Sequence, residues 1–168
     1  MRAVTSKALG PTLGMYSHGV VAPGGEIVVV AGQVGIDRAG RLHGPGDVVA
    51  QTKQTFENIR AVLEAAGSGM AQVVRLQTFL THAADIEGFM RARREVFPRY
   101  FPDGVYPPNT LLVVSRLVQP ELLVEVEAMA VKPEAGREPR RPSTARKAAK
   151  RTGAMKRTGR RQTSRRRR

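Results

Sequence analysis

Cysteine is absent from this chain of 168 residues, and the absence narrows its chemistry. Disulfides and thiolate catalysis are excluded, and a zinc site would need histidine and carboxylate ligands alone. The three histidines, His18, His43 and His82, show no metal-ligand spacing. We therefore expect no metal site.

Long hydrophobic runs are also absent. The longest apolar run, from Ile27 to Ala31, is far too short to span a bilayer. The first residues are not followed by the apolar segment of a secretory signal. Apolar residues make up 41% of the chain, which is ordinary for a globular protein that buries a core. These features favour a soluble cytoplasmic protein.

The common catalytic motifs are missing as well. The sequence contains no P-loop, no GxSxG elbow and no HExxH helix. Gly10, Gly14 and Gly19 do not form a dinucleotide fingerprint. Local motifs alone therefore assign no chemistry to the chain.

The formal net charge of +14 is concentrated at one end of the chain. Residues 132–168 hold 16 lysines and arginines against two acids, Glu134 and Glu138, so this segment alone carries the whole excess. Within it, Met155 is the one sizeable apolar side chain, and nothing offsets the entropy cost of folding. We predict a folded domain over residues 1–131 and a basic disordered tail over residues 132–168.

The tail permits three interpretations. It holds RNA or DNA without sequence specificity through counterion release, it binds acidic membrane surfaces, or it is a dispensable solvated extension. No aromatic residue accompanies its basic residues, so specific single-strand recognition through base stacking is not expected.

Two β-rich runs near the start of the chain, 17–22 and 26–32, are joined by Pro23-Gly24-Gly25. This turn chemistry predicts a hairpin. Residues 36–46 are rich in glycine and include a proline, so they predict a loop.

A helix from Asp47 to Ala66 is the clearest predicted element, because apolar residues recur at steps of three and four. Asp47 is placed to cap the first N–H groups, and Gly67 to end the helix in a left-handed conformation. Residues 84–100 predict a second helix, whose length Pro98 limits.

Alternating or apolar runs over 72–82, 110–118 and 122–131 predict three further strands. The order β-β-α-β-α-β-β implies an α+β fold, a mixed sheet with two helices packed on one face. The segment Val113–Val118 is apolar on both sides of its alternation. This argues for burial by a partner, and therefore for an oligomer.

Six stretches of the chain match the signatures of one known family, in the right order across residues 8–131. They are Gly14-Met15-Tyr16-Ser17-His18-Gly19, Val30-Ala31-Gly32-Gln33-Val34-Gly35, Asp47-Val48-Val49-Ala50-Gln51-Thr52, residues 58–67, Tyr106-Pro107-Pro108-Asn109-Thr110 and residues 124–131. Together they resemble the Rid family, the reactive intermediate deaminases once catalogued as L-PSP endoribonucleases. The resemblance does not cover the tail.

The resemblance implies a homotrimer with a chorismate-mutase-like fold and a ligand cleft at each subunit interface. Deaminating members of the family hydrolyse enamines and imines derived from amino acids, and they release ammonia and a 2-keto acid. They use no metal or organic cofactor. We therefore expect no cofactor, two further copies of the chain as partners, a small-molecule ligand between them, and no membrane insertion.

Several residues match the family's functional positions. Tyr16 corresponds to the cleft tyrosine, Gly32 to the pocket glycine and Glu125 to the glutamate that positions the attacking water. Thr110 and Leu111, which follow the carboxylate-binding position, are expected to line the same cleft. The alternation around Glu125, taken alone, also fits a solvated sheet face.

The position of the family's carboxylate-binding arginine is occupied by Asn109. A guanidinium grips a carboxylate with two charged hydrogen bonds, whereas an amide offers neutral donors. The loss costs on the order of 2–4 kcal/mol of substrate recognition. Standard 2-iminobutanoate or 2-iminopropanoate deamination is therefore in doubt, and Asn109 is either a ligand donor or a turn residue after two prolines. Arg93 either projects into the cleft as a substitute cation or lies on the surface over its neighbours.

Two hypotheses about function remain. The first is a hydrolase acting on an imine, enamine or related carbonyl compound, in which Glu125 positions water, Asn109 orients the substrate and Tyr16 lines the cleft. The second is a non-catalytic trimeric small-molecule binder, with non-specific RNA or DNA binding through the tail. The replacement of arginine by Asn109 favours the second hypothesis or a changed substrate, and the retained Glu125 favours the first.

Overall fold

The computed structural model describes residues 1–6, 8–12 and 14–134. Two short 3-10 helices, Met70–Gln72 and Ala83–Asp85, accompany the main elements. In chain order the main elements are β1 (Arg2–Val4), β2 (Gly19–Val21), β3 (Gly25–Val34), α1 (Val48–Ala65), β4 (Val73–Leu80), α2 (Ile86–Tyr100), β5 (Asn109–Val113) and β6 (Val124–Pro133).

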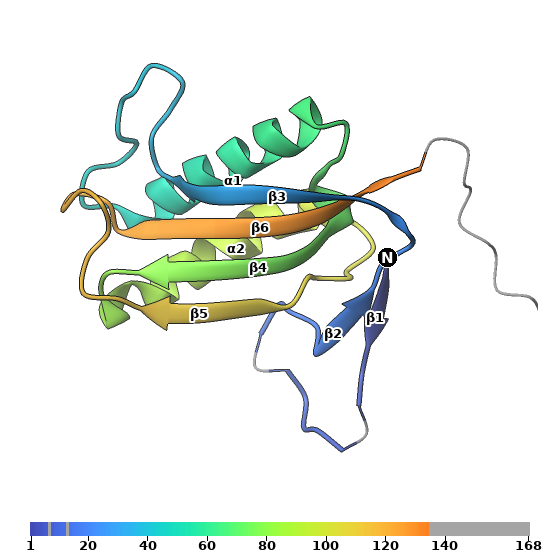
Figure 1. Ribbon diagram of the computed structural model, residues 1–168. Helices are drawn as coiled ribbons and strands as arrows, with labels where there is room; N and C mark the ends of the chain where they lie inside the picture. The colour runs from blue at the N-terminus through green and yellow to red at the C-terminus, as the bar shows by residue number, and fades with distance from the viewer. Residues whose placement is uncertain (7, 13, 135–168) are drawn as a thin grey trace, which may run out of the picture.

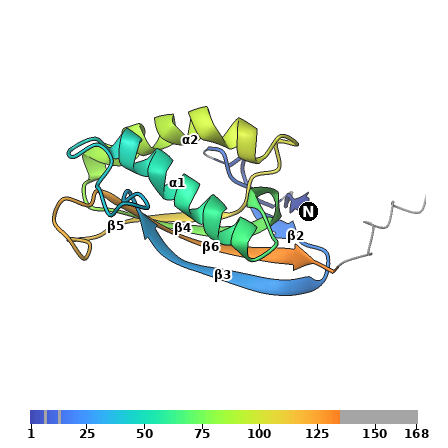
Figure 2. The ribbon, with the colours of Figure 1, turned by 90° about the horizontal axis from the view of Figure 1, so that it is seen from above.

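Four strands form the main sheet in the order β3-β6-β4-β5 (Figure 1). Strands β4 and β5 are parallel, whereas β6 is antiparallel to both of its neighbours, β3 and β4. Helices α1 and α2 lie together on one face of this sheet (Figure 2). The fold is therefore α+β with a mixed sheet and two helices on one face, as the sequence predicts.

The predicted hairpin between 17–22 and 26–32 is wrong. Strand β2 pairs with β1 in a separate two-stranded sheet, and β3 pairs with β6. The turn residue Gly25 belongs to that second pairing, because a Cβ there would lie 2.2 Å from the carbonyl oxygen of Lys132. Pairing with a strand more than a hundred residues away thus prevails over the local turn signal. Strand β1 was not predicted.

The predicted strand over 110–118 is shorter in the structure. Strand β5 is an edge strand whose one partner, β4, ends at Leu80, and Leu80 is paired with Val113. The pairing of β5 with β4 ends at these two residues. Val118 has left the sheet and is 75% exposed.

The last strand extends past the predicted domain end at residue 131. Strand β6 continues to Pro133, and Lys132 Nζ forms an ion pair with Glu26 Oε2 of β3 at 2.9 Å. The first two residues assigned to the tail therefore belong to the sheet. The prediction of disorder for residues 135–168 lies outside the described residues.

Helix α1 confirms the helix predicted over 47–66. Asp47 Oδ1 accepts hydrogen bonds from the backbone N–H groups of Val49 and Ala50, as an N-cap should. Gly67 follows the helix at φ +73°, a conformation that favours glycine.

An aromatic cluster joins the two helices. Phe56 of α1 is fully buried, and its ring meets the rings of Phe89, Phe97 and Tyr100 of α2. At the rim, the Tyr100 hydroxyl donates to Glu57 Oε1 at 2.6 Å. These contacts fix α2 over the sheet, and with it the residues that α2 directs inward.

The opposite face of the sheet carries exposed aliphatic side chains. Ile27 and Val29 of β3 are 66% and 69% exposed, and Leu112 of β5 is also exposed. No helix in the described part of the chain covers this face (Figure 2). Uncovered apolar surface of this kind is typical of an interface between protein chains.

Candidate functional site

Glu125 projects from β6 onto the open face of the sheet. Its neighbours Val124 and Val126 are fully buried on the helix side, so the alternation of the strand turns Glu125 the other way. Gly32 of β3 lies under the carboxyl group, because a Cβ at this glycine would come within 1.8 Å of Glu125 Oε1. The missing side chain of Gly32 lets the carboxyl group lie against the strand.

A bulge in β3 brings Gly32 to this place. The pairing of β3 with β6 shifts register between Val30 and Gln33, so Ala31 and Gly32 together face Glu127. Burial and the neighbouring Glu127 carboxylate raise the pKa of Glu125. A carboxyl group with a raised pKa accepts and releases protons closer to neutral pH, which suits an acid–base role.

The N-terminal segment that carries Tyr16 is held on the helix side of the sheet. Arg93 Nη2 of α2 donates to the carbonyl oxygen of Met15 at 2.5 Å. Ser17 Oγ donates to the carbonyl oxygen of Tyr106 at 2.7 Å. These two bonds, one on each side of Tyr16, position it next to the segment that leads into β5.

Arg93 is enclosed, at 1% exposure. Its guanidinium carbon lies 4.4 Å from the ring centroid of Phe97 and 5.5 Å from that of Phe89. Burial lowers its pKa to about 10, so the group stays charged at neutral pH. The structure places Arg93 in neither of the two expected positions, since it lies inside and positions Met15.

Asn109 is the first residue of β5 and lies opposite Leu76 of β4. Its Oδ1 accepts a hydrogen bond from Thr78 Oγ1 at 3.0 Å. Leu111, two residues on, packs against the core on the same side, whereas Thr110 is exposed and alternates to the open face. The predicted residues of this strand therefore divide between the two faces.

The candidate residues thus form two half-sites on opposite faces of one sheet. The first half-site is Gly32 and Glu125 on the open face. We define the second half-site as Asn109, on the helix side, together with Tyr16, which lines a hollow with Pro11, Thr12 and His18. Within one chain the two do not come together. Thr78 was not predicted, because the alternation of its strand does not reveal which residue of β5 lies beside it.

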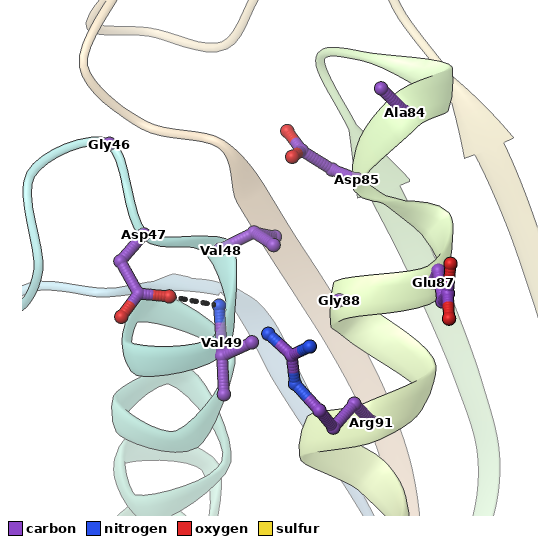
Figure 3. A pocket seen from close by; sticks show the side chains of 9 residues that line it. All are labelled: Gly46, Asp47, Val48, Val49, Ala84, Asp85, Glu87, Gly88 and Arg91. Atoms are coloured by element: carbon purple, nitrogen blue, oxygen red, sulfur yellow. Dashed lines mark hydrogen bonds between the residues drawn. The ribbon is translucent and has the colours of Figure 1, made fainter.

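A separate hollow of about 400 Å³ lies between the first turns of α1 and α2 (Figure 3). Asp47, Asp85, Glu87 and Arg91 line it, and it contains none of the predicted site residues. The Asp47 carboxylate is already engaged in capping α1. Three acids and one exposed arginine around helix ends form a solvated surface here, and we assign no function to it.

Residues 1–6, 8–12 and 14–134 hold no group of three His, Asp or Glu side chains arranged to bind a metal ion. No helix among these residues is both long and apolar enough to cross a membrane.

The comparison with known families decides the identity. The family model for endoribonuclease L-PSP matches residues 5–132. The chain belongs to this family, the Rid family. The match ends one residue before strand β6 does, so residues 133–168 lie beyond it.

Relatives of this Rid protein share both sequence and fold with it. A RutC family protein of Pyrococcus abyssi is 37% identical over 128 residues, which are 76% of this chain and 94% of the relative. The crystal structure of a Rid family protein from Yersinia pestis matches with a TM-score of 0.67 at 33% identity, over 77% of this chain and 97% of that one. TdcF of E. coli with bound serine matches with a TM-score of 0.58 at 25% identity, over 79% and 100%.

Arg93→Met should loosen the Tyr16 segment without unfolding the protein. An apolar side chain of similar size is tolerated in place of a buried charge, so the melting temperature should change little. Hydrogen exchange over residues 14–18 should become about threefold to tenfold faster, because one hydrogen bond to Met15 is lost. Arg94→Met, at the exposed neighbour, is the control. Unchanged exchange in Arg93→Met would contradict the positioning role.

Glu125→Gln should stabilise the protein increasingly as pH rises from about 4 to about 8. A carboxyl group whose pKa is raised by folding favours the folded state at low pH, and this contribution is lost as pH rises through the raised pKa. The glutamine amide does not ionise, so the stability of the variant does not fall in this way as pH rises. Melting temperatures across this range, with exposed Glu87→Gln as control, measure the effect. A difference that shrinks as pH rises would refute the assignment.

Proposed function

We propose that this Rid-family protein hydrolyses imines, enamines or related carbonyl metabolites in a cleft formed between copies of the chain. The observation that carries the proposal is the Glu125 carboxyl group lying against Gly32. This carboxyl group combines a raised pKa with close contact to the backbone of β3.

The proposed reaction adds water across the C=N bond. Glu125 accepts a proton from the attacking water, whose oxygen forms a bond to the imine carbon. As the C=N π bond opens, Glu125 passes that proton to the nitrogen, which gives an adduct with one hydroxyl and one amino group on the same carbon. Glu125 then takes the hydroxyl proton while the carbonyl group forms and transfers it to the nitrogen, and the C–N bond breaks to release ammonia. One imine and one water thus give one carbonyl compound and one ammonia, and Glu125 ends as it began.

A homotrimer unites the two half-sites in this proposal. Glu125 and Gly32 of one copy face Tyr16 and Asn109 of another across the cleft. Two observations support it: the half-sites lie on opposite faces of the sheet, and the open face exposes Ile27 and Val29. The E. coli relative TdcF with bound serine also supports a ligand of amino-acid size.

A second candidate function is a non-catalytic trimeric binder of small molecules. Asn109 favours it, because an amide grips a substrate carboxylate less strongly than an arginine does. In this version the basic tail supplies non-specific RNA or DNA binding. Residues 135–168 lie outside the described residues, so this part of the proposal rests on the charge of the tail.

An ammonia-release assay separates the two functions. With 2-iminopropanoate and 2-iminobutanoate generated enzymatically, we expect slow release by the natural chain and faster release by Asn109→Arg, which restores a charged grip. Glu125→Gln should reduce either rate by about 100-fold or more. Rates equal to buffer for every imine tested would reject the hydrolase and leave the binder.

Light scattering tests the assembly. We expect three times the chain mass of 18.3 kDa. Val29→Lys should release monomers, because it places a charge on the open sheet face. Val62→Lys, which changes an exposed residue of α1, should leave the mass unchanged. A monomer mass for the natural chain would contradict the proposal.

Truncation after Pro133 tests the role of the tail. The full chain should bind RNA or duplex DNA with an affinity that falls steeply as salt rises, and the truncated chain should not. Equal binding by the two forms would exclude the tail as the binding segment.

A further inference from the structure

A single hydrogen bond determines how Asn109 presents its amide. Thr78 Oγ1 lies 3.0 Å from Asn109 Oδ1. Thr78 is fully buried in β4 between Leu76 and Leu80, which are buried on the same face. The strand that carries Asn109 is anchored next to it, since Leu76 N–H donates to the carbonyl oxygen of Pro108 at 2.9 Å.

Hydrogen-bond accounting favours this orientation of the amide. A buried hydroxyl group that cannot donate its proton costs about 1–3 kcal/mol. In the observed orientation Thr78 donates to Asn109 Oδ1 and is satisfied. If the amide were turned over, Thr78 would receive an N–H group, and its own proton would have no acceptor among the described residues.

The consequence is that Asn109 turns its NH2 group away from Thr78. Asn109 is half-buried, and no residue in the described part of the chain accepts a hydrogen bond from its Nδ2. The second half-site therefore offers two neutral donors. The matching ligand atom is an acceptor, such as a carbonyl oxygen.

The charges around the two half-sites also favour an uncharged ligand. The first half-site carries the Glu125 carboxyl group with Glu127 beside it. Arg93 is enclosed by aromatic rings, and Arg75, on the open face opposite Met129, donates to Gln77 Oε1. A ligand carboxylate would meet the Glu125 carboxylate, and none of the described residues places a cation there to offset the repulsion.

We infer that the site takes uncharged imines, enamines or carbonyl compounds that carry an amide, ester or ketone oxygen where an amino-acid derivative carries a carboxylate. Asn109 is the specificity-determining residue, and Thr78 is its positioning residue. The inference rests on the proposed function for the location of the site and adds the class of ligand.

Two stable compounds that differ at one group test the inference. NMR titration compares 2-oxobutanamide with 2-oxobutanoate, which are the carbonyl products expected from a neutral and an acidic imine. The natural chain should bind the amide about tenfold more tightly or better. Asn109→Arg should reverse the preference, because it replaces neutral donors with a cation.

Thr78→Val separates positioning from simple stability. Valine keeps the shape of threonine and removes the hydroxyl group, so the amide of Asn109 is free to turn. We expect amide binding to weaken about threefold to tenfold and binding of the acid to stay unchanged. Thr55→Val, which alters a buried hydroxyl group of α1, should leave the preference intact.

The outcomes distinguish this inference from the proposed hydrolysis. Tighter binding of the acid by the natural chain, or no binding of either compound, overturns the inference. A preference for the amide that survives Thr78→Val overturns the positioning role. A preference for the amide without ammonia release from any imine rejects the hydrolase and leaves the ligand class standing.

Discussion

The antiparallel pairing of β3 with β6 is the contact on which the rest of the structure depends. It joins the first strand of the main sheet along the chain to the last one, from Gly25 against Pro133 to Val34 against Glu125. The bulge within it brings Gly32 under the Glu125 carboxyl group. The same pairing places β6 at the centre of the sheet, where its alternation buries one face beneath the helices and turns the glutamates to the other.

The two faces of that sheet then have separate roles. The helix face is held by the aromatic cluster around Phe56, and α2 uses Arg93 to anchor the segment before Tyr16. The open face presents Glu125 among exposed aliphatic side chains. A complete site requires one face of one chain to meet the other side of a second chain, and this makes assembly a condition of function in the proposal.

The sequence predicted the elements whose signals are local. The periodicity, the Asp47 cap and Gly67 were enough for α1, and the strand alternation around Glu125 was enough for β6. The predicted hairpin was wrong because Gly25 packs closely against the backbone of Lys132, far along the chain, and does not form a turn that pairs β2 with β3. Thr78 and the enclosed position of Arg93 could not be found from sequence, because both depend on register and packing between segments far apart in the chain.

Mixed oligomers test the central claim, that the half-sites meet across copies, most directly. Glu125→Gln and Asn109→Leu chains, each slow in imine hydrolysis alone, are refolded together and compared with each variant refolded separately. If the half-sites come from different copies, about a quarter of the clefts in the mixture combine two intact halves, and activity returns in that proportion. Activity no higher than that of the separate variants would contradict the account.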